Sequence, residues 1–239
     1  MTVTLDHIVI YVEDLDTATA TYREAGFTVN YGGQHTGGVT ENALIVFADG
    51  VYIELIALVD GKQFEDTGFK GLLKATGEGY TGYALQSDNL EADLQGMHER
   101  GVNIGEIREG NRARPDGEQL AWKMAPIDDA MSPFVIQDVT DRGLRVVQTE
   151  ETITHANGAT GVNELLIRVP NLQEAIDHYG RMVGTPLMSL GVARFEVGTP
   201  AIVLTGDADG SMAPALVTLF TDEDTPVKHS LHGADFVFV

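Results

Sequence analysis

Two apolar segments near the N-terminus each carry one residue type suited to chemistry. His7 stands in the run 5–12, and a period of two places it with Leu5 on the face towards the concave side of a sheet. Glu54 interrupts the otherwise apolar run 51–58. A carboxylate there is costly unless it is paired or bound to a cation. The alternatives are a hydrogen-bonded core histidine and an edge-strand glutamate that faces water.

A glycine-rich segment, residues 36–40, is flanked by His35 and Asn42. Glycines let a backbone approach a ligand closely, so this loop is typical of a lid at the rim of a cavity. We therefore count His35 and Asn42 as candidate substrate-binding residues. The alternative is an ordinary hairpin that carries a solvated histidine.

Two arginines, Arg112 and Arg114, precede a Pro-Asp-Gly turn in an acidic chain. A pair of this kind suits a carboxylate or phosphate on a substrate. The alternative is ion pairing with the adjacent Asp116 and Glu118. Trp122, the only tryptophan, is a further candidate for substrate contact, with core packing as its alternative.

Three copies of one pattern position these residues. Each copy has a strand, an Asx residue before a leucine, a short amphipathic segment and then a glycine 12 or 13 positions after the Asx residue. Asx side chains cap helix N-termini, and glycine suits the left-handed position that ends a helix. The Asx residues are Asp14, Asn89 and Asn171, and the glycines are Gly26, Gly101 and Gly184.

Strand-like segments follow each expected helix, so the repeating unit is βαβββ in an α+β fold. We expect a domain over 1–148, with units at 1–59 and 79–142, and a third similar unit over 160–239. The last strand of that third unit is expected at 215–220.

A tandem βαβββ arrangement resembles the vicinal-oxygen-chelate superfamily, and within it the bacterial glyoxalase-like domain proteins. The resemblance implies a cupped mixed sheet. The segments that carry it are Leu5–Val9 with Asp14-Leu15, Gly32–Ile45, Tyr52–Ile56, Arg112–Gly117 with Trp122, and Pro133-Phe134.

The resemblance also implies a metal site, because His7 and Glu54 match two ligand positions of that family. Imidazole and carboxylate suit a divalent Fe, Mn, Ni, Co or Zn ion. In the second unit Gly82 falls opposite His7, and it offers no ligand. The residues that the second unit offers opposite Glu54 are Ile136, Gln137 or Asp138.

The third unit offers a different partner for the same site. Aligning its Asx residue on the first places Glu164 opposite His7 and about Thr218 opposite Glu54. Pairing of the first and third units would then supply His7, Glu54 and Glu164 as metal ligands. Pairing of the first and second units remains the alternative.

The composition narrows the class of partner. Of 239 residues, 36 are acidic and 15 basic, which gives a formal net charge of -21 and disfavours nucleic acid and anionic membranes. The chain has no cysteine, which excludes disulfides and thiolate chemistry. No apolar run is long enough for a membrane helix, so we expect a cytoplasmic protein with a small-molecule ligand. An odd third unit, with Leu166 and Val217 unpaired, predicts a homodimer.

Two functions follow from the site residues. The first is a metal-assisted isomerase, lyase or dioxygenase that acts on a small oxygen-bearing, anionic molecule. The second is a metal-free protein that binds or sequesters a small molecule, as the bleomycin-resistance relatives do. The sequence assigns no residue a catalytic role.

Overall fold

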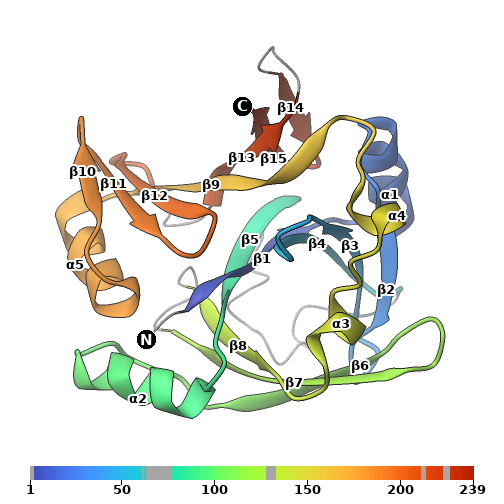
Figure 1. Cartoon of the computed structure of the whole chain (residues 1–239), viewed down its shortest axis with the longest axis horizontal. Coiled ribbons are helices and arrows are strands. Elements are labelled where there is room, and N and C mark those ends of the chain that lie inside the picture. The colour runs from blue at the N-terminus through green and yellow to red at the C-terminus, as the bar shows by residue number, and fades with distance from the viewer. Residues whose placement is uncertain (1–2, 61, 63–76, 128–132, 211–213, 223–226) are drawn as a thin grey trace.

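The computed structural model describes residues 3–60, 62, 77–127, 133–210, 214–222 and 227–239. Most of the linker expected around 60–79 lies outside these residues. The strands form two curved mixed sheets, as Figure 1 shows. The first sheet contains β1 (Thr4–Tyr11), β2 (Asn30–Gln34), β3 (Thr40–Val46), β4 (Tyr52–Leu58), β5 (Gly79–Gln86), β6 (Arg108–Ala113), β7 (Gln119–Pro126) and β8 (Phe134–Asp138). The second contains β9 (Ala159–Val169), β10 (Leu187–Ser189), β11 (Val192–Glu196), β12 (Ala201–Gly206), β13 (Pro214–Thr221), β14 (Lys228–Leu231) and β15 (Ala234–Phe238).

The first sheet consists of two βαβββ units in the order β2-β3-β4-β1-β5-β8-β7-β6. β1 runs parallel to β4, β5 runs parallel to β8, and β1 and β5 join antiparallel at the centre. Three helices, α1 (Leu15–Glu24), α2 (Leu90–Glu99) and α5 (Leu172–Val183), follow the first strands of the units. The expected Asx residues cap all three helices through their side chains, and the expected glycines all have positive φ.

The outer strands of this sheet come together and almost close the cup. An isolated bridge pairs His35 with Arg112, and the Thr36 amide donates to the Asn111 carbonyl at 3.1 Å. A Cβ at position 33 would lie 2.3 Å from the carbonyl oxygen of Ala113, so this close approach requires glycine. The glycine-rich segment therefore joins the two edges of the sheet.

A β-bulge lies in β1 where His7 stands. Leu5 pairs with Leu85 but His7 pairs with Ala84, so the pairing shifts by one residue around Asp6. Because a bulge re-aims the side chains that follow it, Leu5 joins the aliphatic face of the strand. The expectation that Leu5 shares a face with His7 is therefore wrong.

The second sheet repeats the first, with a shorter last unit. Its order is β10-β11-β12-β9-β13-β15-β14, and β13 runs antiparallel to β9 as β5 does to β1. β15 then runs parallel to β13, as β8 does to β5. The segment 215–220 is thus the first strand of a further unit, not the last strand of the third. Residues 222–227 separate β13 from β14, a stretch shorter than the 10 residues of α1 or of α2.

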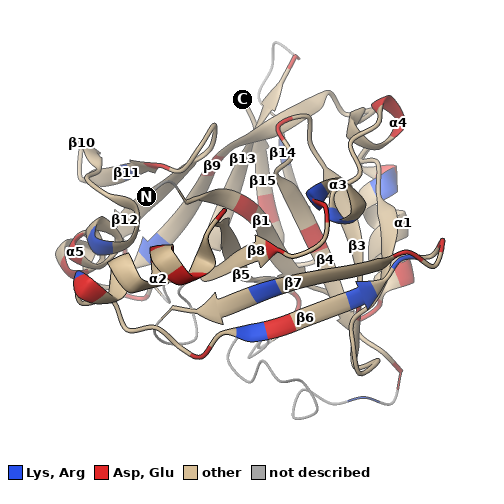
Figure 2. Cartoon of the chain, turned by 60° about the horizontal axis from the view of Figure 1, so that its bottom comes forward, with Lys and Arg blue, Asp and Glu red and all other residues tan. Residues whose placement is uncertain are grey.

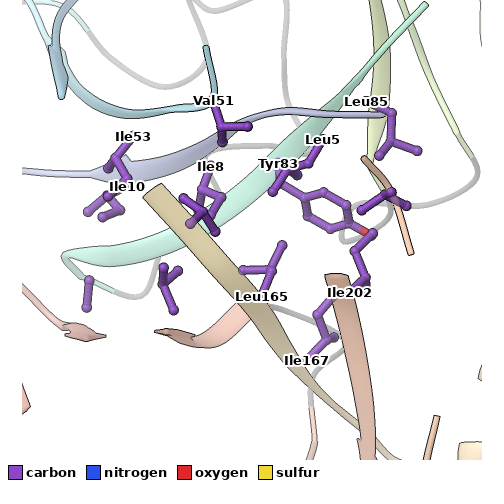
Figure 3. Packing of buried hydrophobic residues seen from close by; sticks show 14 of the residues in the cluster. Leu5, Ile8, Ile10, Val51, Ile53, Tyr83, Leu85, Leu165, Ile167 and Ile202 are labelled. Carbon is purple, nitrogen blue, oxygen red and sulfur yellow. The ribbon is translucent and has the colours of Figure 1, made fainter. Parts of the chain in front are cut away.

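The two sheets share one hydrophobic core. Ile8 and Ile10 of the first sheet and Leu165 and Ile167 of the second belong to the same buried cluster, as Figure 3 shows. Val217 is completely buried in this cluster as well. The chain itself therefore covers Val217, whereas Leu166, which was expected to share its face, is half-buried outside this cluster. The homodimer stays a prediction.

Two short helices, α3 (Arg142–Arg145) and α4 (Glu150–Ile153), connect the sheets. Both lie beside the first sheet in Figure 1. Within the described residues, no helix is long and apolar enough to span a membrane.

The shared core predicts that both sheets unfold together. Leu165→Ala opens a cavity between them and should lower the free energy of unfolding by about 2–5 kcal/mol. The control is Leu166→Ala, since Leu166 is only half-buried on the opposite face of β9, and it should lose clearly less. Urea unfolding followed by far-UV circular dichroism and by Trp122 fluorescence checks this. Two separated transitions in Leu165→Ala would show independent folding units.

Candidate functional site

A cavity of about 210 Å³ lies in the cup of the first sheet. One side of its wall is apolar, and the other carries the chemistry-bearing side chains. The apolar residues include Val9, Ile56, Trp122, Met124, Phe134 and Ile136. The polar residues include His7, His35, Asn42, Glu54, Arg112 and Arg145.

His7 and Glu54 face each other inside this cavity. His7 pairs with Tyr52 and Val9 with Glu54 in the parallel β1–β4 register, which places both side chains on one face of neighbouring strands. The His7 Nε2 atom lies 3.4 Å from Glu54 Oε2, and the two residues are only 3% and 7% exposed. This agrees with the sequence-based expectation that both residues point into one concavity.

The back of the His7 ring is fixed by Asp6, which is fully buried. His7 Nδ1 lies 2.5 Å from Asp6 Oδ1, and the ring stacks on Tyr52 with centroids 4.6 Å apart. Arg145 donates to both Asp6 oxygens at 2.8 and 3.0 Å. Burial alone would raise the pKa of Asp6, but Arg145 and His7 outweigh burial and hold that pKa well below its usual value.

Arg145 belongs to a larger buried network that α3 supplies. It also donates to both oxygens of Asp138, at 2.6 and 2.7 Å, and to the Tyr52 hydroxyl at 2.7 Å. Arg142 adds a further ion pair to Asp6. Sequence reasoning missed all of these residues except Asp138, which it weighed only as a possible ligand. The one available signal was an aspartate beside His7 in an apolar strand.

Glu54 is surrounded by nitrogen atoms. Asn42 Nδ2 donates to its Oε1 atom at 2.6 Å, and His35 Nε2 lies 3.6 Å from the same oxygen. Burial would raise the pKa of Glu54, but His7, His35 and Asn42 reverse this and lower it. Burial also lowers the pKa of His35, against the opposing charge of Glu54. At neutral pH the site therefore presents the ionised carboxylate of Glu54 beside the neutral imidazole of His35.

The His7 ring lies between two carboxylates. Because Asp6 is ionised, His7 Nδ1 carries a proton, and Nε2 then faces the Glu54 carboxylate. A lone pair at that atom would face another lone pair at 3.4 Å, which is unfavourable in a desolvated cavity. A hydrogen-bond donor or a bound cation between the two atoms would resolve this.

A metal site with ligands from both units does not fit these residues. By register, the positions in β5 and β8 that correspond to His7 and Glu54 are Gly82 and Phe134, and neither can bind a metal. The Phe134 ring instead contacts His7 edge-on, with centroids 5.4 Å apart. Within the described residues, no group of three histidine or acidic side chains is placed to hold an ion. Among the same residues, His7 Nε2 and His35 Nε2 lie 3.4 and 3.6 Å from the two Glu54 oxygens.

Glu164, the third candidate ligand, lies away from this cavity. It stands in β9 of the second sheet, where Arg194 forms an ion pair with it. The register of β9 and β12 places Val203, not Thr218, at the position that corresponds to Glu54. The second sheet thus brings no ligand to His7.

The structure divides the remaining candidates. His35, Asn42, Arg112 and Trp122 all line the cavity, and the rings of His35 and Trp122 lie 6.0 Å apart in an edge contact. Arg114 does not line it. Its guanidinium binds Asp116 at 2.6 Å and the Leu144 carbonyl at 3.1 Å, the alternative that the sequence left open.

Comparisons with known proteins identify the family of the chain and proteins with a similar fold. Residues 5–183 match the family model of a glyoxalase-like domain, and no curated protein matches the chain. A crystal structure of a hypothetical protein from Staphylococcus aureus is 16% identical, covers 99% of both chains and has a TM-score of 0.83. The Mn(II)-bound glyoxalase from Novosphingobium aromaticivorans is 10% identical over 98% of this chain and 81% of its own, with a TM-score of 0.58.

A third solved structure is a xylose isomerase-like TIM barrel/4-hydroxyphenylpyruvate dioxygenase fusion protein. It is 13% identical over 92% of this chain and 36% of its own, with a TM-score of 0.55. Identities this low show the fold alone. They confirm the expected vicinal-oxygen-chelate fold of curved mixed sheets.

The buried network predicts a pH-dependent stability. Asp6→Asn removes one of the two carboxylates that Arg145 binds and should cost about 1.5–3 kcal/mol at pH 7. Because the folded-state pKa of Asp6 lies below its unfolded value of about 3.9, its contribution is present above that pH and is lost as the pH falls below it. The difference between the wild type and the variant should therefore narrow below about pH 4. Urea unfolding between pH 3 and 7 measures it, with exposed Asp88→Asn as the control. A difference independent of pH would contradict the assignment.

Proposed function

The chain belongs to the glyoxalase-like domain family, whose fold serves several chemistries, and we propose from the site itself that it transfers protons on a small, oxygen-bearing organic anion. The observation that carries this proposal is the buried contact of Glu54 with His7 at 3.4 Å. The reaction type is an isomerase or lyase reaction that begins with proton removal beside a carbonyl group.

Glu54 is the base in this proposal. Its carboxylate is ionised, and it lines a cavity that also has apolar side chains in its wall. Proton removal needs a carboxylate within hydrogen-bonding reach of the substrate, and a lining position provides that. Asn42 fixes one carboxylate oxygen at 2.6 Å, which leaves the other oxygen towards His7 to receive the proton.

His7 is the acid that serves the substrate oxygen. Asp6 fixes the ring and its tautomer, so Nε2 is directed into the cavity. A proton on Nε2 stabilises the negative charge that develops on a carbonyl oxygen when the neighbouring carbon loses a proton. The Arg112 guanidinium borders the same space and favours an anionic substrate.

A metal-assisted isomerase, lyase or dioxygenase is the second candidate. The separation of 3.4 Å between His7 Nε2 and Glu54 Oε2 favours it, since two ligands at about 2.1 Å from a tetrahedral ion lie about this far apart. The shortage of further protein ligands argues against it. A metal-free binding protein uses the same cavity without proton transfer.

Hydrogen exchange tests the proposal without a known product. A panel of small carbonyl-bearing carboxylates is incubated with the protein in D₂O, and loss of the signal of the proton beside the carbonyl is followed by ¹H NMR. At least one compound should exchange, and Glu54→Gln should slow that exchange by about 10²–10⁴-fold, the usual worth of a general base. Quenching of Trp122, the only tryptophan, reports binding in the same samples. Binding without exchange would favour the sequestering function.

Metal dependence is tested separately. If His7 and Glu54 act by proton transfer, protein treated with chelator should keep its exchange rate within about twofold. Added Mn²⁺, Zn²⁺, Ni²⁺, Co²⁺ or Fe²⁺ should not raise that rate. Metal analysis of the untreated protein accompanies the assay. Stoichiometric metal together with loss of exchange after chelation would favour the second candidate.

A further inference from the structure

A second cavity of about 260 Å³ adjoins the first. Arg112 and Arg145 line both cavities, so their side chains form the boundary between them. Its other lining residues include Asn30, Tyr31, Leu44, Val46, Arg114 and Asp116. The proposed reaction uses the first cavity only.

Arg112 is a buried cation with unused hydrogen-bond donors. It is only 4% exposed, and among the residues that the structure describes no hydrogen bond or ion pair engages its guanidinium. Burying an unpaired charge is costly, and a bound anion would offset that cost. A Cβ at position 32 would come within 3.1 Å of Arg112 Nη1, so Gly32 keeps the surroundings of this group open.

A second donor in this cavity is also unused. Asn30 Nδ2 is buried and has no hydrogen-bond partner. The other cations are occupied, because Arg114 binds Asp116 and Arg145 binds Asp6 and Asp138. Since Arg114 neutralises Asp116, the charge left over in this cavity is that of Arg112.

We propose that the second cavity is an oxyanion subsite in which Arg112 and Asn30 bind a carboxylate or phosphoryl group. This inference rests on the proposed function and names its substrate class: a molecule whose carbonyl end lies against His7 and Glu54, and whose anionic end lies beyond Arg112. Figure 2 shows basic positions on β6 and α3, the elements that supply Arg112 and Arg145, in a chain with a net charge of -21. Local charge therefore governs binding at this place.

Side-chain amide NMR tests the subsite directly. The Asn30 amide signal is assigned as the one missing from the ¹H–¹⁵N spectrum of Asn30→Leu, and the full chain is titrated with acetate and, separately, with inorganic phosphate at constant ionic strength. The Asn30 signal should shift saturably with at least one of the two, which identifies the class of anion. Arg112→Met should raise the midpoint about ten- to hundredfold, as expected for loss of a charged hydrogen bond.

The matched control is Arg108→Met, the same change at an exposed position of the same strand. It should leave the midpoint within about twofold. An Asn30 signal that moves with neither anion, or that moves equally in both arginine variants, would overturn the subsite. Glu54→Gln separates this outcome from the proposed function. It removes proton transfer, and because it takes a negative charge away from the neighbourhood of Arg112, it should not weaken the Asn30 titration. Lost exchange with an intact titration in Glu54→Gln therefore supports both proposals independently.

Discussion

Burial of two carboxylates in one apolar cup is the constraint on which the site depends. Asp6 is fully buried and Glu54 is 7% exposed. Two ionised groups so close to apolar side chains are tolerated only if nearly every oxygen has a donor or a neighbouring positive charge. Arg145 satisfies Asp6, Asn42 satisfies one side of Glu54, and His7 lies between the two acids. The position of His7 is therefore a consequence of charge balance.

The two units of the first sheet contribute different kinds of residue to the cup. The first unit supplies His7 and Glu54, whereas the corresponding positions of the second unit are Gly82 and Phe134. The corresponding positions thus carry ionisable side chains in the first unit and none in the second. Positive charge comes from other places. Arg112 lies near the end of β6, and Arg145 lies in α3, which follows the last strand of the second unit. The site is asymmetric although the fold beneath it is a repeat.

The sequence predicts the repeat well because its signals are local. Asp14, Asn89 and Asn171 cap helices through contacts only three residues away, and such spacing is visible in a single sequence. His7 and Glu54 were also predictable, since a charged residue in an apolar strand is costly wherever it lies. The shorter last unit was not predictable. Residues 215–220 have the pattern of a strand whether they end the third unit or begin a further one, and only their pairing with β9 distinguishes the two.

The parts of the site that escaped prediction depend on contacts between distant segments. Arg145 meets Asp6 across 139 positions, and no local pattern marks that pair. The bulge at Asp6 is equally hidden, because alternation predicts an uninterrupted strand. Yet the bulge places Asp6 next to the His7 ring, and Asp6 is what α3 binds. The bulge in β1 and the distant helix α3 thus act together, and they fix the direction of the His7 imidazole.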